Sequence, residues 1–295
     1  MRQVRNCAVW TLFLCLVSVI AHARPKDPET SIAALESRAG SLYQQGKYAE
    51  AFAAYQQGAE LGSPRSELRL AHLYEAGKGT ARNLEQAFNW VSKAAEQDDA
   101  DAEDLLGVMY QSGTGTPQDY ARALTWYSKA AQQGNSSAEN NLGILYLQAL
   151  GVTQDYALAV AWFSRAAEQG LASAENNLAS LYFGGKGTAQ DYTRALGWFS
   201  KAAEQGLATA EGNLGSMYLN GLGVTRDQAE ARAWLLKSAA QGNENAQAWL
   251  ALMDKQAPQL SAQAAAGKDG GSARNPDTDA AGMQRETSNR SVDLQ

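Results

Sequence analysis

The stretch AENNLASLYFGGKGTAQDYTRALGWFSKAAEQGLAT, from Ala174 to Thr209, decides the fold because it recurs, with changes, on both sides of itself. Gap-free copies follow at a period of 36 residues from Ala102, Ala138 and Ala210, and a more divergent copy begins at Ser66. Three columns keep their residue type in all five copies: Leu70, Leu106, Leu142, Leu178 and Leu214; Tyr74, Tyr110, Tyr146, Tyr182 and Tyr218; and Trp90, Trp126, Trp162, Trp198 and Trp234. Such self-similarity indicates a repeat architecture.

Each copy has the periodicity of two helices. In the first, Leu106 and Tyr110 are four residues apart and share a face. In the second, an apolar stripe follows the spacing i, i+3, i+4, i+7 and i+8, at Ala123, Trp126, Tyr127, Ala130 and Ala131. One such pair cannot bury its apolar face alone, but stacked pairs can. The sequence therefore predicts an all-α, right-handed α-solenoid of helix-turn-helix repeats, with the Trp and Tyr rings filling gaps between copies.

The ends of the predicted helices carry capping residues. We expect the first helices to be capped by the residue before each copy, which is Asp101, Ser137, Ser173 or Thr209. We expect the second helices to be capped by Asp119, Asp155, Asp191 and Asp227, and to end before Gly134, Gly170, Gly206 and Gly242.

The glycine-rich turn between the two helices resembles a phosphate-binding loop in the copy Gly185-Lys186-Gly187-Thr188. A phosphate loop has Lys directly before Ser or Thr and follows a strand. Here a glycine separates Lys186 from Thr188, the preceding segment is helical, and only two of the five copies have the lysine. The glycines are therefore interpreted as turn residues with positive φ.

The pattern Ala-x-x-x-Leu-Gly-x-x-Tyr, a Gly-x-Gly turn, Asp-Tyr-x-x-Ala-x-x-Trp and a closing Ala-Ala-x-x-Gly resembles the Sel-one-like repeat family, a relative of the tetratricopeptide (TPR) repeats. It departs from the family at Ala149, at Asn83-Leu84 and at Gln228. The resemblance implies a non-enzymatic scaffold that binds another protein. Exported bacterial members are associated with envelope regulation, assembly of secreted material and contact with host proteins.

The repeats set the expected domain organisation. Five repeats occupy residues 66–245, divided as 66–101, 102–137, 138–173, 174–209 and 210–245. A linker over 24–34 and a shorter TPR-like pair over 35–65 precede them, and a capping helix over 246–256 follows. Residues 257–295 lack aromatic residues and are predicted to be disordered.

Residues 1–23 have the features of a secretory signal peptide. Arg2 and Arg5 precede an apolar run from Cys7 to Ala21, and Ala21-His22-Ala23 fits a cleavage site. We expect cleavage, export to the periplasm or the extracellular space, and no membrane span afterwards; an uncleaved anchor is the alternative. Both cysteines lie in this segment, so the rest of the chain is expected to be held by packing. The net charge of −6, with scattered charges, argues against a nucleic-acid partner.

By analogy with TPR stacking, the first helices line a concave face. Eight side chains whose columns vary between copies are predicted to contact a partner protein or peptide there: Asn140, Ile144, Leu147, Asn176, Ser180, Phe183, Ser216 and Leu219. Ordinary packing between helices is the alternative for some of them. We expect the protein to be a monomer.

No constellation typical of an enzyme is evident in the sequence. His72 has no second histidine or cysteine nearby, and neither a Ser-His-Asp set nor metal-ligand spacing is found. We therefore predict no catalytic residue, no metal and no cofactor. A secreted hydrolase of cell-wall or related small molecules is the alternative, although the secreted relatives assigned such activities are rich in cysteine.

Overall fold

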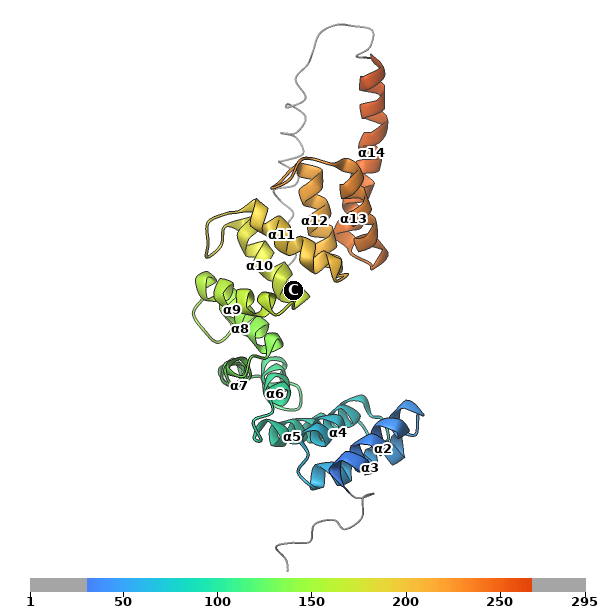
Figure 1. Ribbon diagram of the computed structural model, residues 1–295, viewed down its shortest axis with the longest axis vertical. Helices are drawn as coiled ribbons and strands as arrows, with labels where there is room; N and C mark the ends of the chain where they lie inside the picture. The colour runs from blue at the N-terminus through green and yellow to red at the C-terminus, as the bar shows by residue number, and fades with distance from the viewer. Residues whose placement is uncertain (1–30, 267–295) are drawn as a thin grey trace, which may run out of the picture. The chain divides into compact units, whose positions relative to one another are not determined.

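The computed structural model describes residues 31–266, and every regular element in that range is an α-helix (Figure 1). The chain divides into two compact units at Gln118 and Asp119. The first unit contains α2 (Ile32–Gln44), α3 (Tyr48–Glu60), α4 (Pro64–Ala76), α5 (Leu84–Ala95) and α6 (Ala100–Ser112). The second contains α7 (Tyr120–Gln132), α8 (Ser136–Gln148), α9 (Tyr156–Glu168), α10 (Ala172–Gly184), α11 (Tyr192–Glu204), α12 (Ala208–Asn220), α13 (Gln228–Ala240) and α14 (Glu244–Ala266).

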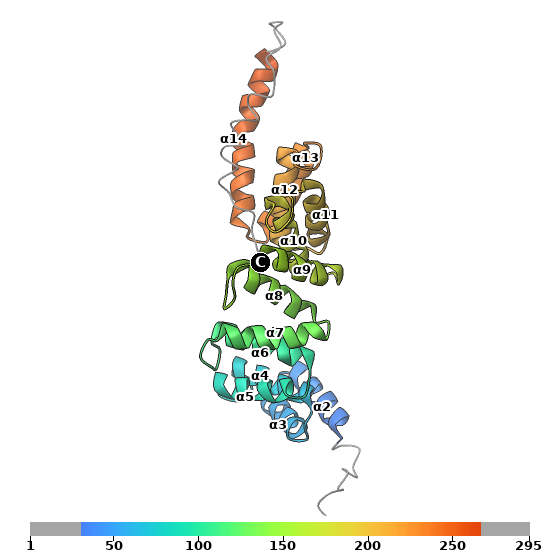
Figure 2. The same ribbon diagram turned by 90° about the vertical axis from the view of Figure 1, so that its left-hand side faces the viewer.

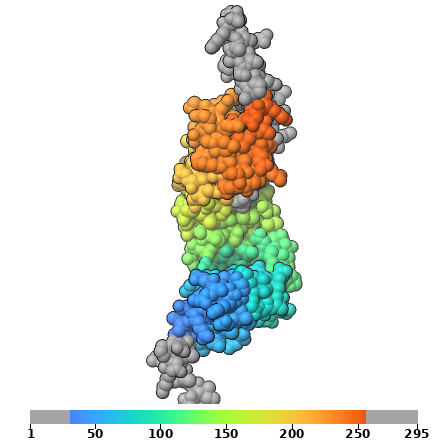
Figure 3. Space-filling model, turned by 90° about the vertical axis from the view of Figure 1, so that its right-hand side faces the viewer, coloured from blue at the N-terminus to red at the C-terminus, as the bar shows by residue number. Residues whose placement is uncertain are grey.

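Within each unit the helices stack in chain order. In the second unit, the pairs α8–α9, α10–α11 and α12–α13 each pack internally, and α9 contacts α10 as α11 contacts α12. We call the earlier member of each pair the first helix and the later member the second helix. The side chains of this unit, coloured green to orange, form a closely packed surface on the face shown in Figure 3. The all-α solenoid of stacked helix pairs predicted from the sequence is confirmed.

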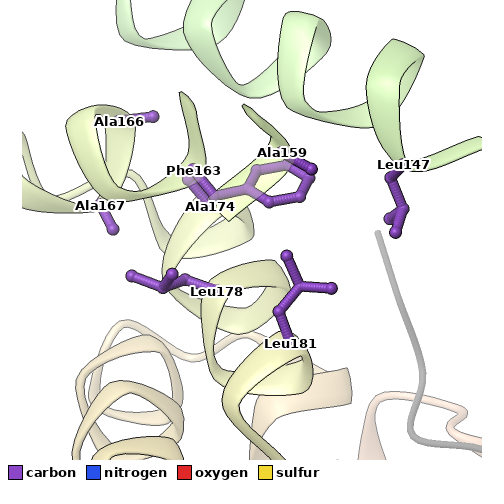
Figure 4. Close-up of a cluster of buried hydrophobic side chains, with 8 residues drawn as sticks. All are labelled: Leu147, Ala159, Phe163, Ala166, Ala167, Ala174, Leu178 and Leu181. Carbon is purple, nitrogen blue, oxygen red and sulfur yellow. The ribbon is translucent and has the colours of Figure 1, made fainter. Parts of the chain in front are cut away.

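The core between successive pairs is built around one buried apolar residue of each second helix, which is aromatic at Tyr127, Phe163 and Phe199 and aliphatic at Val91 and Leu235. Phe163 of α9 is fully buried and packs with Leu147 of α8 and with Leu178 and Leu181 of α10 (Figure 4). Phe199 of α11 has the same role one repeat later, against Leu214 and other residues of α12. Each ring belongs to a second helix and fills the space next to a neighbouring first helix, so a pair is stable only beside its neighbours.

The five tryptophans that recur between copies are half-buried, and the residue that follows each one is buried in the core. A cation lies over the ring of each of these five tryptophans, 3.8–4.9 Å from the ring centroid: Lys93 over Trp90, Lys129 over Trp126, Arg165 over Trp162, Lys201 over Trp198 and Lys237 over Trp234. The prediction that Trp and Tyr fill the gaps is therefore only partly right. Trp198 and Trp234 pack on the edge of the core, and the adjacent column fills its centre.

The first helices begin two residues earlier than predicted. Asp99 and Asn135 are their N-caps and accept hydrogen bonds from the backbone of Ala102 and Ala138. Leu171 and Leu207 stand at the equivalent positions without a side-chain cap and pack against the core instead. The predicted caps Asp101, Ser137, Ser173 and Thr209 thus lie inside the first turn. The helices start earlier because only one residue, in extended conformation, separates each closing glycine from the next helix.

The other predicted ends are confirmed. Asp119, Asp155, Asp191 and Asp227 cap the second helices by accepting backbone N–H bonds. The closing glycines adopt positive φ, at 83° to 89° in Gly134, Gly170, Gly206 and Gly242. The turn glycines also have positive φ, and Ala149, which replaces one of them, is held at φ 58°. A left-handed alanine carries backbone strain that glycine avoids.

The last helix differs from the prediction for the C-terminal end. Helix α14 contacts α12 and α13 and then continues past them to Ala266, beyond the boundary expected at residue 257 (Figure 2). The segment after Pro258 is rich in Ala and Gln, which have high helix propensity, and this explains the extension. The predicted signal peptide over 1–23, most of the predicted linker over 24–34 and the rest of the predicted disordered segment lie outside the described residues.

Candidate binding surface

The residues predicted to bind a partner lie on one face of three first helices in the second unit. The spacing i, i+4 and i+7 places them in three columns, contributed by α8 (Asn140, Ile144, Leu147), α10 (Asn176, Ser180, Phe183) and α12 (Ser216, Leu219). Five are buried, namely Asn140, Leu147, Asn176, Ser180 and Leu219, and three are half-buried, namely Ile144, Phe183 and Ser216.

Two of the buried residues belong to an amide ladder that joins successive first helices. Asn177 Nδ2 donates to Asn140 Oδ1 at 3.1 Å, and Asn213 Nδ2 donates to Asn176 Oδ1 at 3.2 Å. Asn176 and Asn177 are fully buried, and a buried amide must be paired to avoid a desolvation cost. These oxygens are therefore used between α8, α10 and α12. The sequence did show a recurring Asn-Asn pair at 140–141 and 176–177, but not which partner it takes.

The two leucines of the predicted surface are part of the core. Leu147 belongs to the cluster around Phe163, and Leu219 packs with Leu235 and Trp249. Ser180 is also occupied, because its hydroxyl donates to the backbone oxygen of Asn176 at 2.9 Å. Packing therefore accounts for these positions, and whether they also contact a partner stays a prediction.

The accessible part of the predicted surface consists of Ile144, Phe183 and Ser216, so it includes both apolar and polar side chains. Ile144 lies on the edge of the Phe163 cluster, and the Phe183 ring meets Tyr192 edge-on, with 5.2 Å between centroids. Ser216 donates to the backbone oxygen of Asn213 at 2.7 Å. Ile144 and Phe183 each expose part of an apolar side chain on a first helix, and apolar side chains of this kind can anchor a bound segment.

A scan against protein-family models matches the Sel1 repeat at residues 64–99, 100–135, 136–171, 172–207 and 208–243. The chain belongs to the Sel1 repeat family. The matched boundaries coincide with the observed helix starts and lie two residues before those predicted from the sequence. Sel1 repeat proteins generally act as scaffolds for protein–protein interactions, on a fold that is generally non-enzymatic.

Some solved structures resemble the chain in both sequence and fold, and others resemble it in fold alone. A protective antigen of uropathogenic Escherichia coli with an SLR fold is 34% identical, with a TM-score of 0.68, over 75% of this chain and 48% of the antigen. A Sel1 repeat protein from Oxalobacter formigenes is also 34% identical, with a TM-score of 0.68, over 71% of this chain and 86% of that protein. PilF of Pseudomonas aeruginosa is 18% identical, with a TM-score of 0.54, over 75% of this chain and 96% of that one, which shows likeness of fold alone.

The chain spans about half the length of the E. coli antigen it resembles. No curated protein matches the sequence.

A second set of polar contacts joins the first helix to the second helix within individual Sel1 repeats. A glutamate in the first turn of the first helix is buried and accepts a hydrogen bond from a glutamine at the end of the second helix. The pairs are Glu67 with Gln97, Glu139 with Gln169, Glu175 with Gln205, and Glu211 with Gln241. Burial raises the pKa of Glu67 and Glu175, although the glutamine bonds and nearby lysines oppose the shift.

The glutamine that recurs at the end of each second helix is the sequence feature that could have revealed this pairing. In one Sel1 repeat an arginine replaces the lysine of the Trp-covering column. Arg165 Nη2 lies 2.8 Å from Glu139 Oε1 and also donates to the backbone oxygen of Ala131 at 3.3 Å. These groups hold the repeat together.

His72, the histidine weighed as a catalytic candidate, lies on the exposed side of α4. Its Nδ1 is 3.8 Å from a carboxylate oxygen of Glu75, and both side chains are about half exposed. Within residues 31–266, no group of three or more His, Cys, Asp and Glu side chains could hold a metal ion. In the same range no helix is both long and apolar enough to cross a membrane.

Proposed function

We propose that this Sel1 repeat protein is an exported, non-enzymatic scaffold that holds a segment of another protein on the first-helix face of its second unit. The observation that carries the proposal is the contrast between columns. Core columns such as Leu142 and Leu178 repeat their residue type, whereas the accessible positions Ile144, Phe183 and Ser216 have different types from copy to copy. A regular scaffold with a locally varied surface is typical of a repeat protein that recognises one partner.

The chemistry of the accessible positions favours an apolar contact with a polar rim. Ile144 and Phe183 offer half-buried apolar side chains, and Ser216 places a hydroxyl one repeat further along. The buried amide ladder beneath them keeps α8, α10 and α12 at a constant spacing. Such a rigid base lowers the entropy cost of binding.

The binding test uses two double variants with the same chemical change. Ile144→Glu with Phe183→Glu alters the first-helix face, whereas Leu158→Glu with Leu236→Glu alters second-helix residues that are 42% and 51% exposed. A photoreactive cross-linker at position 183 identifies the bound protein in envelope and extracellular fractions, and purified partner is then titrated against each folded variant. The first-helix variant should lose at least about tenfold in affinity and the second-helix variant should bind normally. The reverse result rules out the proposed face.

Export is tested separately, because binding and location can fail independently. The full chain is expressed in a bacterium, and the cytoplasmic, periplasmic and medium fractions are compared. The mature protein should leave the cytoplasm and begin at Arg24, directly after the predicted cleavage site. Full-length protein confined to the cytoplasm would contradict the export proposal.

A further inference from the structure

A cavity of about 420 Å³ lies in the first unit among α2, α3 and α4. Its lining includes Tyr43, Tyr55, Arg69, His72, Leu73 and Glu75. The volume is in the range that holds small-molecule groups or side chains of a bound peptide. The cavity belongs to a different unit from the surface proposed above and does not depend on it.

Two lining residues, His72 and Glu75, occupy the columns that hold Ser216 and Phe183 on the accessible face of the second unit. Arg69 stands in the column of Asn177 and Asn213, which donate to the preceding first helix. Arg69 makes no such link. Among the described residues its guanidinium forms neither an ion pair nor a hydrogen bond, although it lines the cavity.

Tyr55 provides a second donor from a buried position. It occupies the column of Phe163 and Phe199 and is only 7% exposed, so its ring fills the core in the same way. Tyr55 lines the cavity, and within residues 31–266 its hydroxyl has no hydrogen-bond partner. Burial raises the pKa of Tyr55 above its ordinary value, against the opposing effect of Arg69. The phenol therefore stays protonated at neutral pH and can donate.

The lining holds one cationic side chain, Arg69, and one acidic side chain, Glu75, and a second cation, Lys78, lies beside Tyr43 of the lining. Lys78 Nζ donates to the Tyr43 hydroxyl at 3.0 Å and lies 5.2 Å from the centroid of that ring. Glu75 is the acidic group of the lining, and its carboxylate faces His72 at 3.8 Å. Arg69 forms no ion pair among the described residues, so its guanidinium can accept an anionic partner.

We propose that this cavity binds a peptide carboxylate, with Arg69 and Tyr55 as the donors and Leu73 against the adjoining apolar part of the peptide. A guanidinium and a carboxylate are both planar and can form two parallel hydrogen bonds, and a neutral phenol adds a third donor to the same group. The carboxylate can belong to the C-terminus of a chain or to an acidic side chain. Both offer the same chemistry, and the experiment separates them.

The test measures three short peptides against the full chain by NMR chemical-shift titration. The peptides are N-acetyl-Ala-Leu-Leu with a free C-terminus, the same peptide as the C-terminal amide, and N-acetyl-Leu-Glu-Leu amide. At least one carboxylate peptide should bind about tenfold more tightly than the uncharged amide, since a charge-assisted hydrogen bond is lost in the amide. The tighter of the two carboxylate peptides identifies the source. Equal binding of all three, or binding of none at millimolar concentration, overturns the proposal.

Variants then assign the site. Arg69→Gln should remove carboxylate binding, and Tyr55→Phe should weaken it about fivefold while keeping the core packing that Phe provides in later repeats. Arg38→Gln on α2 makes the same charge change at an exposed residue outside the cavity lining and should have no effect. Equal losses in Arg38→Gln and Arg69→Gln would show long-range attraction only and would overturn the site. The Ile144→Glu, Phe183→Glu variant should bind these peptides normally, which separates this result from the proposed function.

Discussion

The N-terminal pair α2–α3 and the Sel1 repeat α10–α11 use the same columns with different side chains. Where the repeat has Leu178, Trp198 and Phe199, the N-terminal pair has Ala39, Ala54 and Tyr55, and its interhelical turn is four residues shorter. The core column stays aromatic and buried in both. The space beside this column differs, because the pair α2–α3 has Ala54 in place of the Trp and has a cavity at its junction with α4. The comparison shows that the stacking depends mainly on the buried core column, whereas the columns beside it can change their side chains.

The largest expected effect comes from emptying the shared core column. Phe199 is fully buried, so Phe199→Ala should lower the free energy of unfolding by about 3–5 kcal/mol through lost burial and a residual cavity. Urea unfolding followed by circular dichroism measures the change. Leu158→Ala, on an exposed part of α9, is the control and should change it by less than about 0.5 kcal/mol. Similar effects of the two changes would mean that the ring is not the centre of the core.

The next largest effect is expected at a glycine of the turn between the two helices of a Sel1 repeat, because the N-terminal pair has a shorter turn at this place. A Cβ at Gly187, where φ is 72°, would lie 2.3 Å from the carbonyl oxygen of Tyr156. A Cβ at Gly206, where φ is 83°, would meet nothing within 4 Å. Gly187→Ala should therefore cost more than about 2 kcal/mol, and Gly206→Ala about 1 kcal/mol from the backbone alone. Equal costs would show that close approach of backbones does not fix the turn.

Replacing the left-handed alanine by glycine should stabilise the protein, whereas the two glycine substitutions above should destabilise it. Ala149 sits at φ 58° where other repeats have glycine. Ala149→Gly should relieve about 1–2 kcal/mol of backbone strain in the folded state. Glycine also gives the unfolded chain more conformational entropy, which offsets part of that gain, so the free energy of unfolding should rise by up to about 1 kcal/mol. Thermal melting measures this gain, and a lower melting temperature would contradict the strain argument.

The smallest effect concerns a buried charge and depends on pH. The pKa of Glu175 is raised by burial, so the folded state holds its proton more tightly than the unfolded chain does. The contribution is favourable at acid pH and is lost as pH rises through the folded pKa. Glu175→Gln keeps an acceptor for Gln205 and should be more stable than wild type at about pH 7, with a difference that shrinks towards about pH 4.

A matched charge change separates local from global effects in this comparison. Glu168→Gln alters an exposed glutamate at the end of α9 that is not among the groups acting on Glu175, and its stability relative to wild type should show little dependence on pH. If the two variants gave the same pH profile, net charge rather than burial of Glu175 would be the cause.

Some site residues could be placed from sequence and others could not. The i, i+4 and i+7 spacing correctly put Asn140, Ile144 and Leu147 on one helix face. Sequence could not show that Asn140 accepts from Asn177, because residues 37 apart meet only through the stacking of α8 on α10. Nor could it show that Leu147 turns into the Phe163 cluster whereas Phe183, in the same column, stays half exposed.

The sequence alone determined the repeat, the helix pairs, the caps of the second helices and the glycine turns, because each depends on contacts within a few residues or on strict periodicity. The tertiary structure decided which members of each column are buried, how the Asn and Glu–Gln pairs are satisfied, and where a cavity remains beside Tyr55. Those outcomes depend on how large and small side chains from neighbouring helices fill a shared space. No single helix encodes that fit.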